Sequence, residues 1–269
     1  MEVMNVNEVH LWMAGTEACH KADLVETYRS WLDEQERIHY RDLKFPEHRH
    51  EYLVAHALLR SCLSYYGERQ PWEWSFVKNA YGRPEIQTKR GAPPMRFNLS
   101  HTDGLVVCAV TRSADIGVDV ERVTLGEDLV AVANISFTSE EIACLSQWKG
   151  IDWQKRFFEL WTLKEAYVKA RGLGLSLPLQ QFSFLFRTNE LGHTWFTFKP
   201  EITLSNHWKF WLMSPTPHHR LAVAVCHDSS MIIQTRQVTP GIKIEPLQLP
   251  LITSCYSKSM NLRRKPLPI

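Results

Sequence analysis

The chain has 269 residues, of which 44% are hydrophobic, and its 31 Lys and Arg against 29 Asp and Glu give a formal net charge of +2. A charge balance this even argues against wholesale nucleic-acid binding. Any recognition of phosphate therefore has to be local. The length suffices for one large domain or two ordinary ones with a substantial core.

The first thirty residues contain charged side chains and no apolar run of signal-peptide length. No uninterrupted apolar stretch is long enough to span a membrane. We therefore expect a cytoplasmic protein without a membrane partner. The six cysteines are scattered singly, which argues against a zinc site and against a disulfide framework and predicts reduced thiols.

The apolar pattern of the N-terminal part predicts two strands and two helices. In chain order these are a strand at residues 9–13, a helix at 23–37, a helix from Pro46 to Tyr66 and a strand at 74–78. Pro46 suits the first turn of its helix, and Gly67 is the stop signal. Arg49 and His50 lie on this second helix, on a face that we interpret as basic and solvated.

Two turns follow that present polar side chains. The Gly and Pro of residues 79–84 mark a tight turn carrying Arg83. After a basic loop at 89–94, residues 97–104 predict a strand end and a turn that offers Ser100 and His101. Such a turn can hold an anion, and it is equally typical of a capped turn without chemistry.

Residues 105–111 and 116–120 read as two strands of a hairpin. Because strand side chains alternate, Asp119 and Glu121 point to the same face, opposite to Val118 and Val120. Two neighbouring acids on one face repel unless a cation lies between them, and their oxygens suit Mg²⁺ or Mn²⁺. The alternative is an edge strand with a solvated acidic face.

The central prediction is a helix that Asp152 caps and Gly172 closes, preceded by helices at residues 127–133 and 138–148. On it Glu165 lies four residues from both Trp161 and Lys169, so all three share one face. A carboxylate on an aromatic face requires a partner, namely a Lys, a metal ion or a ligand. The alternative is an exposed Glu165–Lys169 pair on an ordinary amphipathic helix.

After a turning loop at 172–178, four runs read as strands: residues 182–187, 194–198, 208–213 and 221–226. From Ser229 the periodicity fades and prolines accumulate, which predicts an irregular extension whose basic residues 263–265 form a solvated tail. Helix followed by strands occurs both before and after Glu121. This echo indicates two similar halves.

Four motifs in this order resemble the Sfp-type 4'-phosphopantetheinyl transferases: Tyr81-Gly82-Arg83-Pro84, Phe97-Asn98-Leu99-Ser100-His101, Ile116-Gly117-Val118-Asp119-Val120-Glu121 and Trp161-Thr162-Leu163-Lys164-Glu165-Ala166. The resemblance covers about residues 9–228. It implies an α/β (α+β) fold of two similar subdomains related by a pseudo-twofold, with the active site in the cleft between them. The implied division is 1–115, 116–228 with the metal site, and a C-terminal extension at 229–269.

The resemblance further implies Mg²⁺-dependent transfer of the phosphopantetheine arm of coenzyme A to a serine of an acyl or peptidyl carrier protein, with release of 3',5'-ADP. Its implied metal ligands are Asp119, Glu121 and Glu165. Its implied catalytic residues are Glu165, as candidate base, and Lys169. The implied contacts to coenzyme A are made by Arg49, Arg83, Ser100, His101, Lys164 and Lys169.

One position departs from the family pattern, and a second matches it but has a competing structural role. Glu51 stands where the family has an Arg for the 3'-phosphate, with Arg49 and His50 just before it. Glu141 aligns with a family acid near the metal, yet its capping-box spacing from Thr138 predicts a structural role. We expect a monomer, and the pathway that the carrier protein serves stays open.

Two other functions fit the same residues. One is a different Mg²⁺-dependent enzyme that cleaves phosphodiesters, since an Asp-x-Glu strand pair with a distant Glu suits two-metal chemistry. The even charge argues against a nucleic-acid substrate for it. The other is a non-catalytic protein that binds carrier domains through the same cleft.

Overall fold

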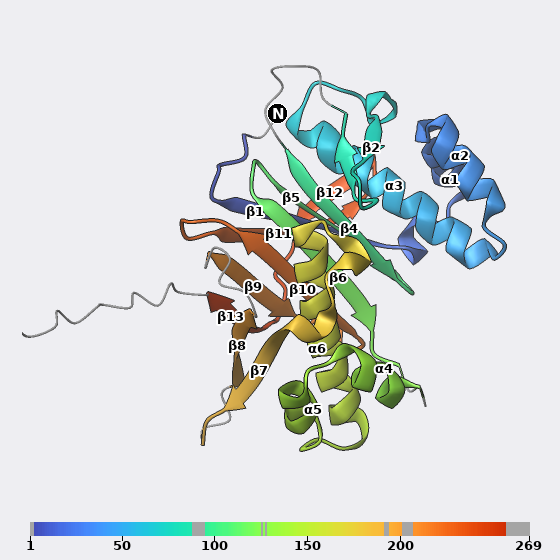
Figure 1. Cartoon of the computed structure of the whole chain (residues 1–269). Helices are drawn as coiled ribbons and strands as arrows, with labels where there is room; N and C mark the ends of the chain where they lie inside the picture. Colours follow the sequence, from blue (N-terminus) through green and yellow to red (C-terminus); the bar gives the residue numbers. More distant parts are fainter. Residues whose placement is uncertain are drawn as a thin grey trace, which may run out of the picture.

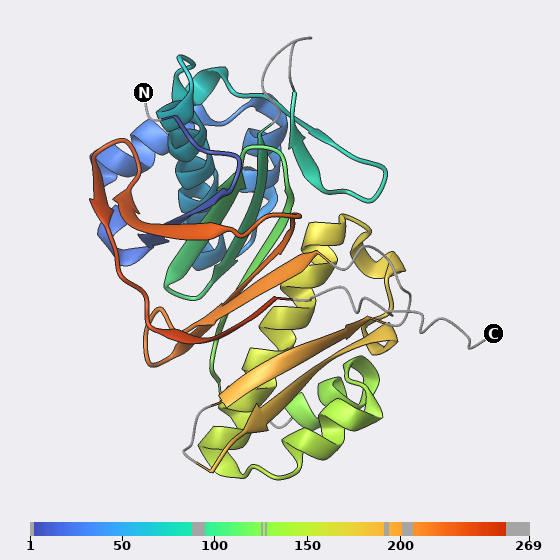
Figure 2. The ribbon, with the colours of Figure 1, turned by 90° about the vertical axis from the view of Figure 1, so that its left-hand side faces the viewer.

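The computed structural model describes residues 3–87, 95–124, 126, 128–190, 194–200 and 207–256. The protein is an α+β fold whose two halves stack their sheets face to face, with helices on both outer sides (Figure 1, Figure 2). Among the described residues, no helix is long and apolar enough to cross a membrane.

The first half is a five-stranded sheet in the order β12-β11-β1-β5-β4, in which only the β1–β11 pair is parallel. The strands are β1 Glu8–Gly15, β4 Arg96–Thr102, β5 Leu105–Thr111, β11 Ile232–Thr239 and β12 Lys243–Pro246. Its helices are α1 Ala22–Trp31, α2 Glu34–Asp42 and α3 Pro46–Tyr66. A small hairpin joins β2 Phe76–Lys78 to β3 Pro84–Ile86.

The second half is an antiparallel sheet in the order β13-β9-β10-β6. Its strands are β6 Asp115–Arg122, β9 Trp208–Met213, β10 His219–Cys226 and β13 Leu251–Tyr256. Its helices are α4 Leu129–Ser136, α5 Ser139–Leu145 and α6 Gly150–Arg171. A hairpin of β7 Phe182–Thr188 and β8 Thr194–Pro200 lies beside α6, and single 3-10 turns occur at Glu17–Cys19, Pro71–Glu73, Gly174–Ser176 and Leu179–Gln181.

Strand alternation divides the apolar side chains among three cores. On β5, Val107 and Ala109 enter the core between the two sheets, whereas Val106 and Cys108 face the helices of the first half. On β6, Val118 and Val120 point into the core between the sheets. Because alternate residues take the other face, Gly117, Asp119 and Glu121 point toward α6.

Strand β6 and helix α6 approach each other at backbone distance. A Cβ atom at Gly117 would lie 2.0 Å from the Ala166 carbonyl oxygen and 2.4 Å from the Ala170 nitrogen. Real Cβ atoms do not come so close to backbone, so only glycine permits this packing. This contact fixes the distance between α6 and the face of β6 that carries Asp119 and Glu121.

The two sheets meet along a seam between β4 and β6. The Asn98 side-chain carbonyl accepts from the Val118 N–H at 2.8 Å, and the Ser100 hydroxyl accepts from the Val120 N–H at 3.3 Å. One step further, the Thr102 hydroxyl accepts from the Arg122 N–H at 3.2 Å. Alternate side chains of β4 thus replace a backbone ladder and hold the two halves in parallel register.

Several predicted elements have the expected form. Pro46 begins α3, Gly172 ends α6 in a left-handed conformation with φ 63°, and Thr138 forms a capping box with Glu141. The long helix α3 of the first half and α6 of the second, 21 and 22 residues long, each pack on one sheet. This layout agrees with the predicted pair of similar halves.

Three local predictions were wrong. The helix expected at 23–37 is broken into α1 and α2, because Asp33 forms a capping box with Glu36 that starts a new helix. Helix α6 begins at Gly150, so Asp152 lies in its first turn and is not the cap. The segment after Ser229 is not irregular but supplies β11 and β12 to the first sheet and β13 to the second.

The basic residues 263–265 and the loop at 89–94 lie outside the described residues. The predicted division at residue 115 falls at the first residue of β6.

A buried ion cluster joins α2 to α3. Glu36 accepts a hydrogen bond from His56 at 2.8 Å and one from Arg60 at 2.5 Å, and Arg60 is fully buried. Burial by itself would raise the pKa of the Glu36 carboxyl, but the hydrogen bond from His56 and the charges of His56 and Arg60 outweigh it and lower the pKa to about 2. The ordinary value is 4.5.

This depressed pKa predicts how stability depends on pH. A carboxyl with a lowered pKa in the folded state stabilises the fold fully above pH 4.5 and loses that contribution as the pH falls toward about 2. The free energy of unfolding of Glu36→Gln should lie about 2 to 3 kcal/mol below that of the wild type at pH 6. This difference should shrink between pH 4.5 and pH 2.

Denaturant unfolding of both proteins at several pH values measures the difference. Glu34→Gln is the matched control, since Glu34 lies on the same helix with 70% of its side chain exposed. It should follow the wild type throughout. A Glu36→Gln difference that stays constant down to pH 2 would contradict the assignment.

Candidate functional site

Helix α6, strand β6 and strand β4 together form a pocket of about 410 Å³. It is lined by Leu99, Ser100, His101, Asp119, Glu121, Trp161, Glu165 and Lys169. Two acids come from the α6-facing side of β6, and Glu165 comes from α6 one turn from Trp161 and Lys169. Three motifs that are far apart in the sequence therefore meet in one place.

The centre of the pocket is a closed set of three hydrogen bonds. The Lys169 ammonium donates to Asp119 Oδ1 at 2.6 Å and to the Ser100 hydroxyl at 3.1 Å, and that hydroxyl lies 3.1 Å from the same Oδ1. Asp119 is 3% exposed, whereas the Lys169 side chain is 28% exposed. The ammonium thus neutralises a buried carboxylate while keeping one side open to the pocket.

The two remaining acids are held in a state that resists ionisation. Burial, and then the charge of Asp119, raises the pKa of Glu121 to about 7, although the Lys169 charge and the Trp161 N–H offset part of the shift. Burial and Asp119 also raise the pKa of Glu165. The cluster therefore carries more carboxylate than Lys169 alone can balance.

These acids fit a hard divalent cation such as Mg²⁺ or Mn²⁺. Asp119 Oδ2 is buried without a hydrogen-bond donor, which leaves an acceptor oxygen without a partner beside two carboxyls of raised pKa. Oxygen donors of this kind are the preferred ligands of both ions. Within the described ranges, no three His, Cys, Asp or Glu side chains already stand at metal-binding spacing. In this conformation Lys169 supplies the positive charge instead.

His101 lies at the rim of the pocket and contacts α3. Its Nδ1 is 3.6 Å from a carboxylate oxygen of Glu51, and 46% of its side chain is exposed. Burial of the ring lowers the His101 pKa more than Glu51 raises it. Glu51 is therefore a neighbour of the pocket. Arg49 does not line the pocket, and its Nε donates to the Leu43 carbonyl at 2.5 Å.

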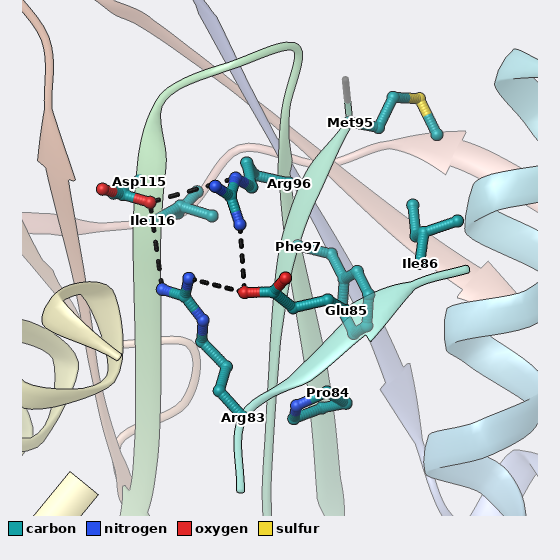
Figure 3. A pocket seen from close by; sticks show the side chains of 9 residues that line it. All are labelled: Arg83, Pro84, Glu85, Ile86, Met95, Arg96, Phe97, Asp115 and Ile116. Atoms are coloured by element: carbon teal, nitrogen blue, oxygen red, sulfur yellow. Dashed lines mark hydrogen bonds and ion pairs between the residues drawn. The ribbon is translucent and has the colours of Figure 1, made fainter. Parts of the chain in front are cut away.

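Arg83 lies at the C-terminal end of α6, next to a second pocket (Figure 3). Its guanidinium donates to the Ala170 carbonyl at 3.2 Å, and a Cβ at Gly172 would come within 2.6 Å of it. The turn and the glycine predicted separately from the sequence thus meet, and the cation complements the negative end of the helix dipole. Arg83 also bonds to Glu85 at 2.9 Å.

Lys164 was expected near the other basic residues, and the structure corrects this. Its side chain is fully buried, and its ammonium forms a 2.8 Å ion pair with Glu141, whose side chain is also fully buried. The same ammonium donates to the carbonyls of Leu179 and Phe182. Neighbouring residues on a helix point in different directions, so Lys164 leaves the face that carries Glu165. Glu141 consequently has a structural role.

The roles of Asn98 and Thr102 were not predicted from the sequence. Their hydrogen bonds to β6 form the seam that brings Ser100 next to Asp119. The signal was present as polar residues at every second position of the strand, with Phe97 and Leu99 between the first three. Without knowing which strand faced β4, the pattern had no evident partner.

Comparison with known proteins adds three findings. A family model described as the 4'-phosphopantetheinyl transferase superfamily matches residues 115–226. The 4'-phosphopantetheinyl transferase HetI of Nostoc sp. is 34% identical over 172 residues, which cover 63% of this chain and 71% of HetI. The 4'-phosphopantetheinyl transferase Sfp of Bacillus subtilis is 30% identical over 158 residues, covering 59% of this chain and 68% of Sfp.

A solved structure of a holo-(acyl-carrier-protein) synthase from Bacillus anthracis, in complex with CoA (3',5'-ADP), is also similar. It is 21% identical with a TM-score of 0.35, covering 43% of this chain and 96% of that one.

Proposed function

The chain belongs to the 4'-phosphopantetheinyl transferase superfamily, and on that premise we propose how its pocket performs the reaction. The enzyme transfers the 4'-phosphopantetheine arm of coenzyme A to a serine hydroxyl of a carrier protein, and 3',5'-ADP leaves. The observation that carries the residue roles is the hydrogen-bonded set of Ser100, Asp119 and Lys169 beside Glu121 and Glu165.

The pyrophosphate of coenzyme A is bound by the cations and hydroxyl at the pocket surface. Lys169 places its partly exposed ammonium there, and Ser100 and His101 add a hydroxyl and a ring N–H. Charge-assisted hydrogen bonds to phosphate are short and strong, so these groups orient the phosphorus that is attacked. They also offset negative charge on the leaving phosphate.

Asp119, Glu121 and Glu165 would hold the Mg²⁺, with Mn²⁺ as a substitute. When bound, the ion supplies Lewis-acid stabilisation of the pyrophosphate. Its charge would also lower the pKa values of Glu121 and Glu165, which burial and the charge of Asp119 now raise.

Glu165 also accepts the proton of the incoming serine hydroxyl. Burial and Asp119 raise the pKa of Glu165, and the charge of a bound cation would lower it again and keep Glu165 ionised, which is the form that accepts a proton. Lys169, the second catalytic residue, contacts the transferred group directly.

The test is the mass of a carrier protein incubated with coenzyme A, Mg²⁺ and the enzyme. A phosphopantetheine mass increment that needs all three components supports the proposal. An unmodified carrier that nevertheless binds the protein would favour a non-catalytic binding module, and cleavage of other phosphodiesters would favour the second alternative. Repeating the assay without Mg²⁺ and with several carriers addresses the metal and the carrier class.

Arg83 provides a prediction about binding. If it contacts coenzyme A away from the reacting phosphorus, Arg83→Ala should raise the KM for coenzyme A about tenfold and change kcat little, because such a contact stabilises ground and transition states alike. Steady-state kinetics with varied coenzyme A measures both constants. Arg96→Ala is the control, since Arg96 shares the bond to Glu85 at 3.2 Å.

An unchanged KM for coenzyme A would sink the proposed contact. A fall in kcat alone would mean that Arg83 acts through its bond to the end of α6.

The remaining assignments belong to the same proposal. Arg49 needs a change of side-chain conformation to reach coenzyme A, since it now bonds to the Leu43 carbonyl. Lys164 drops out of the set of ligands. We place the reaction in the cytoplasm, where the six free cysteines would stay reduced, and expect a monomer without nucleic-acid or membrane partners.

A further inference from the structure

A third pocket lies on the second half of the protein, between α5, the first part of α6 and the β7–β8 hairpin, and we call it the hairpin pocket. Its cavity of about 470 Å³ is in the size range of small-molecule sites. It is lined by Cys144, Gln147, Trp148, Arg156, Leu160, Phe186, Arg187, Thr188 and Trp195. None of these residues lines the pocket assigned to the transfer reaction.

The hairpin pocket has a surplus of positive charge. Two of its lining residues are arginines and none is an acid. Arg156 is 9% exposed and pairs with Glu159 at 2.8 Å, but Glu159 also accepts from Arg220 at 3.1 Å. One buried carboxylate therefore serves two buried guanidinium groups, which leaves a net positive charge behind the pocket wall.

Arg156 is also short of hydrogen-bond acceptors. Its Nε and Nη1 atoms are buried and make no hydrogen bond, since the close approach to Glu159 lacks hydrogen-bond geometry. A buried guanidinium with missing acceptors is costly unless a nearby anion compensates it.

The walls of the pocket are aromatic. The Arg156 guanidinium carbon lies 3.9 Å from the centroid of the Phe186 ring and 5.1 Å from that of Trp148. Trp148 and Trp195 remain 38% and 40% exposed. Large aromatic rings left exposed around a cavity mark a surface built to contact another flat apolar group.

The pocket next to Arg83 shows what a balanced site looks like (Figure 3). There Arg83 and Arg96 face Glu85 and Asp115 at distances of 2.9 to 3.9 Å, so each cation has an anion. The two arginines and two acids that line that pocket compensate one another's charge. The hairpin pocket differs from it in lacking any lining acid.

We propose that the hairpin pocket is a separate binding site for a small organic anion that carries a flat aromatic ring. The ring lies against Trp148 and Trp195, and the carboxylate faces Arg156 and Arg187. The carboxylate of the ligand supplies a second negative charge, because Glu159 alone pairs with both Arg156 and Arg220.

The experiment uses calorimetric titration of the full chain with naphthalene-2-carboxylate, in the presence of saturating coenzyme A. Naphthalene-2-carboxamide is the matched probe, because it keeps the ring and loses the charge. Trp195→Ala and Arg187→Gln change exposed residues of the hairpin pocket. Trp72→Ala is the matched control, since Trp72 is 58% exposed and lies in the other half of the protein.

We expect saturable binding of one carboxylate per chain, with the amide binding at least about tenfold more weakly because it cannot pair with a guanidinium. Trp195→Ala should weaken binding by about three- to tenfold, the range for one aromatic contact. Arg187→Gln should weaken it as well, and Trp72→Ala should not.

Equal affinity for the acid and the amide would overturn the proposal, as would the absence of saturable binding by the wild type. An equal loss in Trp72→Ala and Trp195→Ala would also overturn it. The comparison of acid with amide uses the unmodified protein, so it decides the question even where a variant folds poorly. No transfer activity is measured, so the proposed function can fail independently.

Discussion

Asp119→Ala should reduce carrier modification by about a thousandfold or more, the several kcal/mol expected for loss of a metal ligand at the reacting phosphate. The same change leaves Lys169 without its 2.6 Å partner. That ammonium can still meet water, because 28% of its side chain is exposed. Removing one of three mutually repelling carboxyls also favours the folded state. The fold should therefore persist.

Carrier mass and thermal unfolding are measured for the variant at saturating coenzyme A over a series of Mg²⁺ concentrations. Asp119→Asn tests the charge while keeping the size of the side chain. Asp152→Asn is the control, an exposed acid on α6 whose partner is Lys155. Normal turnover of Asp119→Ala at limiting Mg²⁺ would remove Asp119 from the metal site.

Glu165→Gln separates two roles of one residue. An exposed pair with Lys169 would be worth about 0.3 to 0.5 kcal/mol, so its loss would change little. A metal ligand or base should instead cost roughly a hundredfold in turnover or more. The pocket supports the second forecast, because Glu165 lines it with Asp119 and its pKa is raised by burial and by that neighbour.

Whereas the turnover of Glu165→Gln should fall, its stability should hold or rise. A carboxyl whose pKa is raised in the folded state destabilises it once ionised, so the neutral amide should hold or raise the melting temperature without ligand at pH 8. Glu140→Gln is the control, since Glu140 is an exposed residue of α5 that pairs with Lys199. Near-normal turnover of Glu165→Gln would return Glu165 to a structural role.

Much of the site could be predicted because its signals are local and periodic. Alternation along a strand places Asp119 and Glu121 on one face, and four-residue spacing groups Trp161, Glu165 and Lys169 on a helix. These rules depend only on backbone geometry. They therefore held once the secondary structure was right.

The errors concern partners rather than patterns. Lys164 is adjacent to Glu165 in the chain, but its side chain turns toward Glu141 and toward carbonyls before and at the start of β7. The break between α1 and α2 depended on recognising a capping box at Asp33. Nothing local to Arg83 showed that its turn would meet the end of α6.

The strands after Ser229 were missed for a related reason. Strand β11 pairs in parallel with β1, which lies more than two hundred residues earlier in the chain. The pairing of two segments so far apart in the chain produces no hydrophobic periodicity in either segment alone.

That pairing has a consequence for synthesis on the ribosome. Strand β1 is made more than two hundred residues before the strand that covers its outer edge, which runs from Ile232 onward. The edge of β9 in the second sheet, which β13 covers, is closed later still. Until then the nascent chain exposes strand edges open to wrong pairing. Contacts this distant in the chain also form slowly, so neither sheet can be completed until β11 and β13 have been made.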